Sequence, residues 1–125
     1  MANILIIDDD DDVRNYLMRL VAMFQHTPFY AENCDKGRKL IGQNNPRMDV
    51  IISDVYLPDG PPDAVNWIGE LKDAAAGRPL IVISGAASDQ LVQEIEGSDE
   101  IMATLTKPFE LVFIEELLKK ATGQA

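Results

Sequence analysis

The sequence predicts an α/β fold, built on a doubly wound parallel sheet with helices packed on both faces. Two observations predict it. Short apolar runs alternate along the chain with longer amphipathic segments, which is the pattern of repeated strand–helix units. The apolar runs are nearly continuous, as expected of strands that are buried on both faces of a sheet. The 125 residues fit a single domain, and we expect residues 1–125 to form it.

Five segments are predicted to form the strands. Residues 4–7, 50–52 and 80–83 are uninterrupted runs of isoleucine, leucine and valine, which indicates strands covered on both sides. Residues 29–31 and 102–106 are weaker candidates because their runs are less uniformly apolar. The connections between neighbouring parallel strands are expected to be right-handed crossovers.

Helical segments lie between these strands and after the last one. Three of them repeat apolar residues at spacings of three and four, which places those residues on one face of a helix. The members are Val13, Leu17, Leu20, Val21 and Phe24 in the first helix, Ala64, Trp67, Ile68 and Leu71 in another, and Leu111, Ile114, Leu118 and Ala121 in the last. Weaker helices are expected over residues 35–43 and 88–96, the latter with Ser88 as its N-cap.

Charge and composition exclude several classes of function. The 11 basic and 21 acidic residues give a net charge of −10, whereas nucleic acids and anionic membranes attract basic surfaces. The one cysteine, Cys34, excludes an internal disulfide and a zinc cluster held by thiolates. No apolar run approaches the roughly 18 residues of a membrane span, and no basic stretch precedes the first run. We therefore expect a cytoplasmic protein without nucleic-acid or membrane partners.

Reactive side chains follow four of the predicted strands. The first strand leads into five consecutive aspartates at residues 8–12, the third ends at Ser53 and Asp54, the fourth ends at Ser84, and the fifth leads into Lys107. Ligands of parallel sheets bind beyond the carboxyl ends of the strands, so these groups would converge there. Crowded carboxylates repel one another, and a hard cation such as Mg2+ relieves the repulsion. Because an aspartate can be a nucleophile and a lysine can neutralise a phosphoryl group, this set fits phosphoryl transfer to an aspartate.

Each of these residues also has a simpler interpretation. A run of aspartates most often begins a solvated helix, where anions suit the positive end of the helix dipole, and we assign residues 10–12 to that role. Asp54 or Ser84 alone could belong to a turn, and Lys107 could be a surface charge. The simpler interpretation explains the pattern only if it applies at all four strand ends at once. That coincidence is large, so we favour the functional interpretation.

Taken in order, four motifs resemble those of response-regulator receiver domains, the phospho-accepting modules of two-component signalling. They lie at residues 4–10, 49–60, 79–85 and 106–109 and read ILIIDDD, DVIISDVYLPDG, PLIVISG and TKPF. The resemblance covers essentially the whole chain. It implies a flavodoxin-like sheet of five parallel strands in the order 2-1-3-4-5, flanked by five helices. It also implies a signalling module that is no enzyme beyond catalysing its own phosphorylation and dephosphorylation.

The resemblance assigns roles in phosphoryl transfer by position in these motifs. Asp54 matches the phosphorylated aspartate, Ser84 the switch hydroxyl, and Lys107 the lysine that contacts the phosphoryl group. The phosphoryl group would come from a histidine kinase or a histidine phosphotransfer protein. The family often has a cis peptide bond before the next proline, which is Pro108 here.

The same resemblance implies a Mg2+ site. Asp9 matches the principal metal carboxylate, and Asp54 is a second ligand. Tyr56 is expected to offer its backbone carbonyl, whereas Asp8 matches the carboxylate that holds the site indirectly or through water. Mg2+ is accordingly the cofactor that the resemblance implies.

Two features depart from the family pattern. Thr104 stands where relatives often have an aromatic residue that rotates inward on activation, and the stretch 97–107 is longer than usual. Both features bear on the output of the switch rather than on phosphorylation. On the last helix, Val112 and Phe113 add apolar surface beyond its predicted core face. That surplus fits either a contact surface for a downstream target or second copy, or isolated exposed residues.

Two other functions stay open at this point. A haloacid-dehalogenase-like phosphatase would use Asp8 and Asp10 as nucleophile and acid, although it would need a further acidic strand end after Lys107. A phosphorylation-independent, receiver-like adaptor would bind partners through the same fold, which Thr104 would allow.

Three residues invite functional interpretations that we do not adopt. His26 is expected to cap the end of the first helix or to lie exposed, because a lone histidine without partners is a poor ligand. Cys34 is assigned to packing rather than redox chemistry. Trp67, at helical spacing, is assigned to core or half-buried packing.

Overall fold

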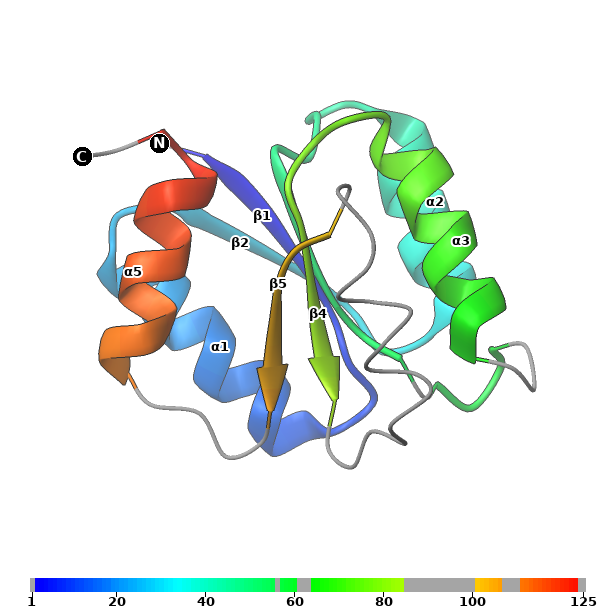
Figure 1. Ribbon diagram of the computed structural model, residues 1–125, viewed down its shortest axis with the longest axis horizontal. Coiled ribbons are helices and arrows are strands. Elements are labelled where there is room, and N and C mark those ends of the chain that lie inside the picture. The colour runs from blue at the N-terminus through cyan, green and yellow to red at the C-terminus, as the bar shows by residue number, and fades with distance from the viewer. Residues whose placement is uncertain (1, 56, 61–63, 85–100, 107–110, 124–125) are drawn as a thin grey trace.

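The fold is described from a computed structural model of the chain (Figure 1). The described residues are 2–55, 57–60, 64–84, 101–106 and 111–123. Within them, the description covers the backbone alone for residues 64–65, 84, 101–106 and 111–113.

Five parallel strands form one sheet in the order β2-β1-β3-β4-β5, which confirms the order implied by the resemblance. The strands are β1 (Asn3–Ile7), β2 (Thr27–Ala31), β3 (Val50–Asp54), β4 (Leu80–Ser84) and β5 (Ile101–Thr106). β2 begins two residues before the predicted 29–31 and includes Pro28, which pairs with Ile4. Proline cannot donate to a strand ladder, and its place here on an edge strand makes this tolerable.

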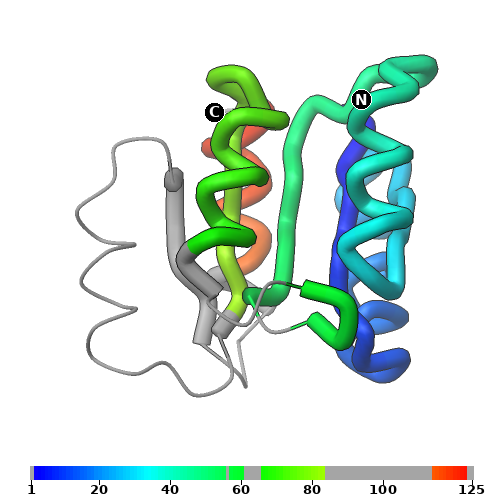
Figure 2. Tube along the Cα trace, turned by 90° about the vertical axis from the view of Figure 1, so that its right-hand side faces the viewer, coloured from blue at the N-terminus to red at the C-terminus, as the bar shows by residue number. Residues whose placement is uncertain are grey.

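Helices cover both faces of this sheet. They are α1 (Asp11–Met23), α2 (Cys34–Gln43), α3 (Ala64–Ala75) and α5 (Leu111–Ala121). α1 and α5 lie on one side of the sheet and α2 and α3 on the other, as Figure 1 and the quarter-turned view in Figure 2 show. The helix predicted over residues 88–96, with its Ser88 cap, lies outside the described residues. Among the described helices, none has the length and apolar character needed to cross a membrane.

Side-chain caps set where two of the helices begin. Asp10 is the N-cap of α1, and its carboxylate accepts hydrogen bonds from the backbone N–H groups of Asp12 and Val13 at 2.9 and 3.2 Å. Asn33 caps α2 by accepting from the N–H of Lys36 at 2.8 Å, so this helix begins one residue before the predicted 35–43. Such caps satisfy N–H groups that have no partner inside the helix.

The strands divide the core into two layers, because alternate residues of a strand point to opposite faces. Toward α2 and α3 lie Leu5, Ile7, Ile51, Leu80 and Val82, packed with Cys34, Ile41, Trp67, Ile68 and Leu71. Toward α1 and α5 lie Ile4, Ile6, Val50, Ile52, Ile81 and Ile83, packed with Leu17, Leu20, Val21, Ile114 and Leu118. In α1, α3 and α5 the predicted positions Leu17, Leu20, Val21, Trp67, Ile68, Leu71, Ile114 and Leu118 are buried, whereas the buried Ala75 of α3 and Cys34, Gly37 and Ile41 of α2 were not predicted from apolar spacing.

His26 corrects one of the expectations from the sequence. Its side chain is 4% exposed, and Nδ1 accepts a hydrogen bond from the backbone N–H of Ala2 at 3.1 Å. The C-cap of α1 is instead Phe24. His26 therefore ties the start of β1 to the end of α1, a contact between distant segments that a lone residue in the sequence does not reveal.

Candidate functional site

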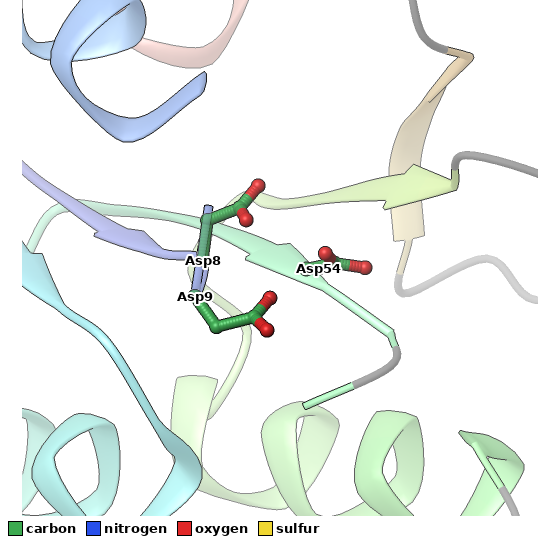
Figure 3. Close-up of side chains that lie close together, drawn as sticks. All are labelled: Asp8, Asp9 and Asp54. Carbon is green, nitrogen blue, oxygen red and sulfur yellow. The ribbon is translucent and has the colours of Figure 1, made fainter. Parts of the chain in front are cut away.

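The carboxyl ends of β1 and β3 lie side by side and carry three aspartates. The register pairs Ile7 with Ser53, so Asp8 and Asp54 are the next residues on adjacent strands. One carboxylate oxygen from each of Asp8, Asp9 and Asp54 lies within 4.8 Å of the others (Figure 3). The predicted convergence of these carboxylates at one edge of the sheet is therefore present.

Two of the three aspartates in this cluster are buried, which is unusual for this residue type. Asp8 is 0% and Asp54 6% exposed, whereas Asp9 lies exposed at the rim. Negative charges held this close repel, and burial deprives two of them of water. The set consists of oxygen donors only, which is the donor type that Mg2+ prefers. The chemistry of this acidic triad therefore fits a hard divalent cation.

Backbone contacts hold Asp8 in place. Its N–H donates to the carbonyl of Ala31 at 3.0 Å, which extends the pairing between β1 and β2 by one residue. Its carbonyl accepts from Arg14 Nη1 at 3.0 Å, and its carboxylate accepts from the N–H of Asp10 at 2.9 Å. Arg14 also forms an ion pair with Asp11. The start of α1 is thus bonded to the end of β1.

The other three aspartates of the run serve the helix, as predicted. Residues 10–12 are exposed, and the Asp10 carboxylate is engaged in capping α1. Asp11 and Asp12 occupy the first turn, where negative charge suits the helix dipole. A phosphatase that used Asp10 as its acid would have to take that carboxylate away from the cap.

Asp54 is the last residue of β3, and a hydrogen-bond chain from α3 reaches its backbone. The Ser53 hydroxyl donates to the carbonyl of Asp54 at 2.8 Å. The same hydroxyl oxygen accepts from the indole Nε1 of Trp67 at 3.1 Å. The helical spacing of Trp67 predicts a packing role alone; the ring is indeed in the core, at 1% exposure, but its N–H also donates a hydrogen bond. Apolar spacing reveals the packing role and carries no signal for the polar one.

The loop after Asp54 is fastened to the start of α2. The Asp59 carboxylate accepts from the backbone N–H groups of Cys34 and Asp35 at 2.8 and 3.0 Å. Burial alone would raise the pKa of Asp59, but these hydrogen bonds outweigh it and hold the pKa below its usual value. Burial and the adjacent Asp59 raise the pKa of the Cys34 thiol to about 12. Cys34 is therefore protonated and buried, as expected of a packing residue.

The remaining predicted residues have the following places. Ser84 ends β4 opposite Thr106, and Thr104 pairs with Val82; the side chains of Ser84 and Thr104 lie outside the description. Tyr56, Lys107 and Pro108 lie outside the described residues. The same holds for the side chains of Val112 and Phe113.

Comparisons with known proteins agree on one family. The family described as "Response regulator receiver domain" matches residues 4–120. The chain belongs to this family. It is therefore a phospho-aspartate receiver of a two-component system rather than a classical enzyme, and a receiver domain implies a histidine kinase as partner.

Individual relatives show how far the similarity extends. The chain is 31% identical to the KDP operon transcriptional regulatory protein KdpE of Escherichia coli (strain K12) over 97% of this chain. It covers 51% of KdpE, so it spans about half the length of that relative.

Solved structures support the same fold. A response regulator receiver protein from Burkholderia phymatum is 25% identical, with a TM-score of 0.80, covering 100% of this chain and 98% of that one. A response regulator from Burkholderia pseudomallei is 26% identical, with a TM-score of 0.77, covering 98% of this chain and 70% of that one. The latter contains a phosphorylated aspartic acid, a calcium ion and citrate.

Proposed function

We propose that Asp54 is the residue that accepts the phosphoryl group, with Mg2+ held by Asp9, Asp54 and the carbonyl of Tyr56. The supporting observation is the placement of Asp54: a buried carboxylate at the end of β3, within 4.8 Å of those of Asp8 and Asp9. Asp8 is proposed to act through water or by holding its neighbours. The structure of the related Burkholderia pseudomallei protein, with its phosphorylated aspartate and divalent cation, supports this assignment.

The proposed reaction moves one phosphoryl group. A carboxylate oxygen of Asp54 forms a bond to phosphorus while the bond from phosphorus to the partner's histidine nitrogen breaks, and that nitrogen keeps the electron pair. Asp54 is suited to this because the end of β3 fixes its backbone while leaving its carboxylate beside the exposed Asp9. When bound, Mg2+ would supply positive charge to offset the oxygens of the triad and of the phosphoryl group. Lys107 is proposed to contact the phosphoryl group and Ser84 to move toward it as the switch.

We propose that residues 1–125 act as one receiver domain in the cytoplasm, with a histidine kinase or histidine phosphotransfer protein as phosphoryl donor. Its output would be a changed contact with a downstream target or a second copy. The last helix is the proposed surface for this contact.

A modification experiment tests the acceptor assignment. The protein is treated with acetyl phosphate and Mg2+, and its intact mass is measured. One labile phosphoryl adduct is expected in the wild type and none in Asp54→Ala, whereas the matched variant Asp12→Ala, at an exposed helix position, should keep the adduct. An adduct that persists in Asp54→Ala would contradict the proposal, and its loss in Asp8→Ala would favour the phosphatase. Absence of any adduct in the wild type would favour the adaptor.

Thermal unfolding tests the metal site. A cation that binds only the folded state must raise the melting temperature. Asp9→Asn removes one negative charge from the triad, so it should stabilise the metal-free protein and abolish the gain from Mg2+. An unchanged Mg2+ gain in Asp9→Asn would exclude Asp9 as a ligand.

A further inference from the structure

We propose that Trp67 and Ser53 act together as positioning residues for Asp54, through the hydrogen-bond chain from indole to hydroxyl to carbonyl. This inference rests on the proposed function of Asp54 as the phosphoryl acceptor. It is carried by two contacts: Trp67 Nε1 to Ser53 Oγ at 3.1 Å, and Ser53 Oγ to the Asp54 carbonyl at 2.8 Å.

The direction of the chain follows from the chemistry of its members. An indole nitrogen can only donate and a backbone carbonyl can only accept, whereas a serine hydroxyl has one proton and two lone pairs. Once the hydroxyl oxygen accepts from Trp67, its proton is aimed at the Asp54 carbonyl. Ser53 is 0% and Trp67 1% exposed, so bulk water does not compete for these bonds.

This hydrogen-bond chain holds the backbone of Asp54, which determines where its carboxylate lies. The carbonyl and the carboxylate of Asp54 are attached to the same Cα, so fixing the carbonyl restrains the backbone torsion at the end of β3. The carboxylate must meet those of Asp8 and Asp9 within 4.8 Å. A small rotation at the strand end would therefore change the geometry of the triad, and small errors of placement are costly in phosphoryl transfer.

Trp67 is itself held from two sides. Its ring packs in the core layer that faces α2 and α3. The guanidinium of Arg38, on α2, lies 5.3 Å from the ring centroid and pairs with Glu70 of α3 through contacts of 2.7 and 3.2 Å. The indole N–H is thus presented to Ser53 by a ring whose position both helices determine.

Three variants and one control test the proposal. Trp67→Phe removes the N–H donor and keeps an aromatic ring, Ser53→Ala removes the hydroxyl, and the double variant removes both. The control is Ile68→Val, which alters the adjacent buried residue of α3. The measurement is the rate constant of Asp54 phosphorylation by acetyl phosphate at saturating Mg2+, at a temperature where every variant is folded.

Each single variant is expected to lower this rate constant by about 3- to 10-fold, while the control leaves it unchanged. The double variant should be no slower than the slower single variant, because the two groups act in series. A wild-type rate in Trp67→Phe, or losses that simply multiply, would overturn the proposal. If the wild type acquires no adduct on Asp54, the proposed function itself fails, which is a different result.

A measurement on the wild type covers the case in which Trp67→Phe does not fold. Trp67 is the only tryptophan of the chain, so its indole N–H gives a single side-chain signal of its kind in a nitrogen–proton NMR spectrum. Adding Mg2+ and beryllofluoride, a phosphoryl mimic, is expected to shift this signal through Ser53. An indole signal that stays unmoved while the backbone signals of Asp8 and Asp54 shift would overturn the proposal.

Discussion

The helices on the two faces of the sheet contact the region of the triad in different ways. On the side of α2 and α3, Trp67 is connected through the Ser53 hydroxyl to the backbone carbonyl of Asp54. Asp59, in the loop after β3, accepts hydrogen bonds from the start of α2. On the side of α1 and α5, the described contacts with the sheet are largely apolar, apart from those of Arg14 and Asp10 with Asp8. The difference suggests that one face mainly supplies stability, whereas the other also sets the geometry at Asp54.

The largest expected effect comes from a substitution on the face of the sheet that α1 and α5 cover. Leu118→Ala removes a side chain that is 1% exposed in the layer between the sheet and α5. Truncating a buried leucine costs about 2–5 kcal/mol of unfolding free energy, because transfer energy is lost and a cavity remains. Denaturant unfolding should show this loss. The Mg2+ dissociation constant of the folded protein should stay unchanged, and a severalfold weaker affinity would break the proposed division between the faces.

The next largest effect is expected from substituting two glycines of α2, on the face of the sheet that α2 and α3 cover. A Cβ at Gly37 would lie 2.8 Å from Cδ1 of Ile7, the residue directly before Asp8, whereas a Cβ at Gly42 would meet nothing within 4 Å. Gly42→Ala should stabilise the protein by about 0.5–1 kcal/mol, since alanine favours helix. Gly37→Ala should destabilise it by roughly 1 kcal/mol, because overpacking exceeds that gain. Gly37→Ala should also weaken Mg2+ binding, and equal affinities in the two variants would contradict this role of α2.

The sequence predicted the parts of this architecture that repeat. Alternating apolar runs placed the strands, and helical spacings placed most core-facing residues of α1, α3 and α5, because burial follows the period of each element. The aspartates were predicted as a cluster because each follows a strand, and parallel strands end at one edge.

The contacts around the cluster were not predictable in this way. Trp67 and Ser53 lie 14 residues apart in the sequence, and Asp59 lies 25 and 24 residues from the two N–H groups that it accepts from. Elsewhere in the fold, the buried His26 lies 24 residues from its partner Ala2. Such pairings depend on how neighbouring elements pack, and no local pattern in one sequence specifies them. Trp67 shows this most clearly, because one side chain fills the core and also donates to the strand.

A smaller effect is expected at Asp59, whose carboxylate accepts hydrogen bonds from two N–H groups in the first turn of α2. Its pKa is lowered in the folded state by the N–H groups of Cys34 and Asp35, which outweigh the opposing effect of burial. Its stabilisation is therefore complete above its unfolded pKa, near 3.8, and is lost as the pH falls through the folded value. Asp59→Ala should lower the unfolding free energy by about 1 kcal/mol at pH 7, a modest loss because the residue is exposed. Asp59→Asn should lower it by less.

Unfolding measured at pH 7 and at pH 3 checks this prediction. The difference between wild type and Asp59→Ala should shrink at the lower pH, where the wild-type carboxyl begins to be protonated. A difference that grows on acidification would show that the carboxylate is not what stabilises the start of α2.

The smallest effect is expected at the outer end of the Trp67 contacts. Glu70→Gln removes the charge that pairs with Arg38, but both side chains are nearly half exposed, at 43% for Arg38 and 45% for Glu70. Exposed ion pairs contribute at most about 1 kcal/mol and are screened by salt. We expect Glu70→Gln to cost about 0.5 kcal/mol in low salt and less in high salt. The rate of Asp54 phosphorylation should not change, because the core packing of Trp67 keeps its N–H on Ser53. A slower rate in Glu70→Gln would mean that the exposed pair of Arg38 and Glu70, rather than the core packing, sets the position of the indole. The geometry of Asp54 would then depend on the interface between α2 and α3.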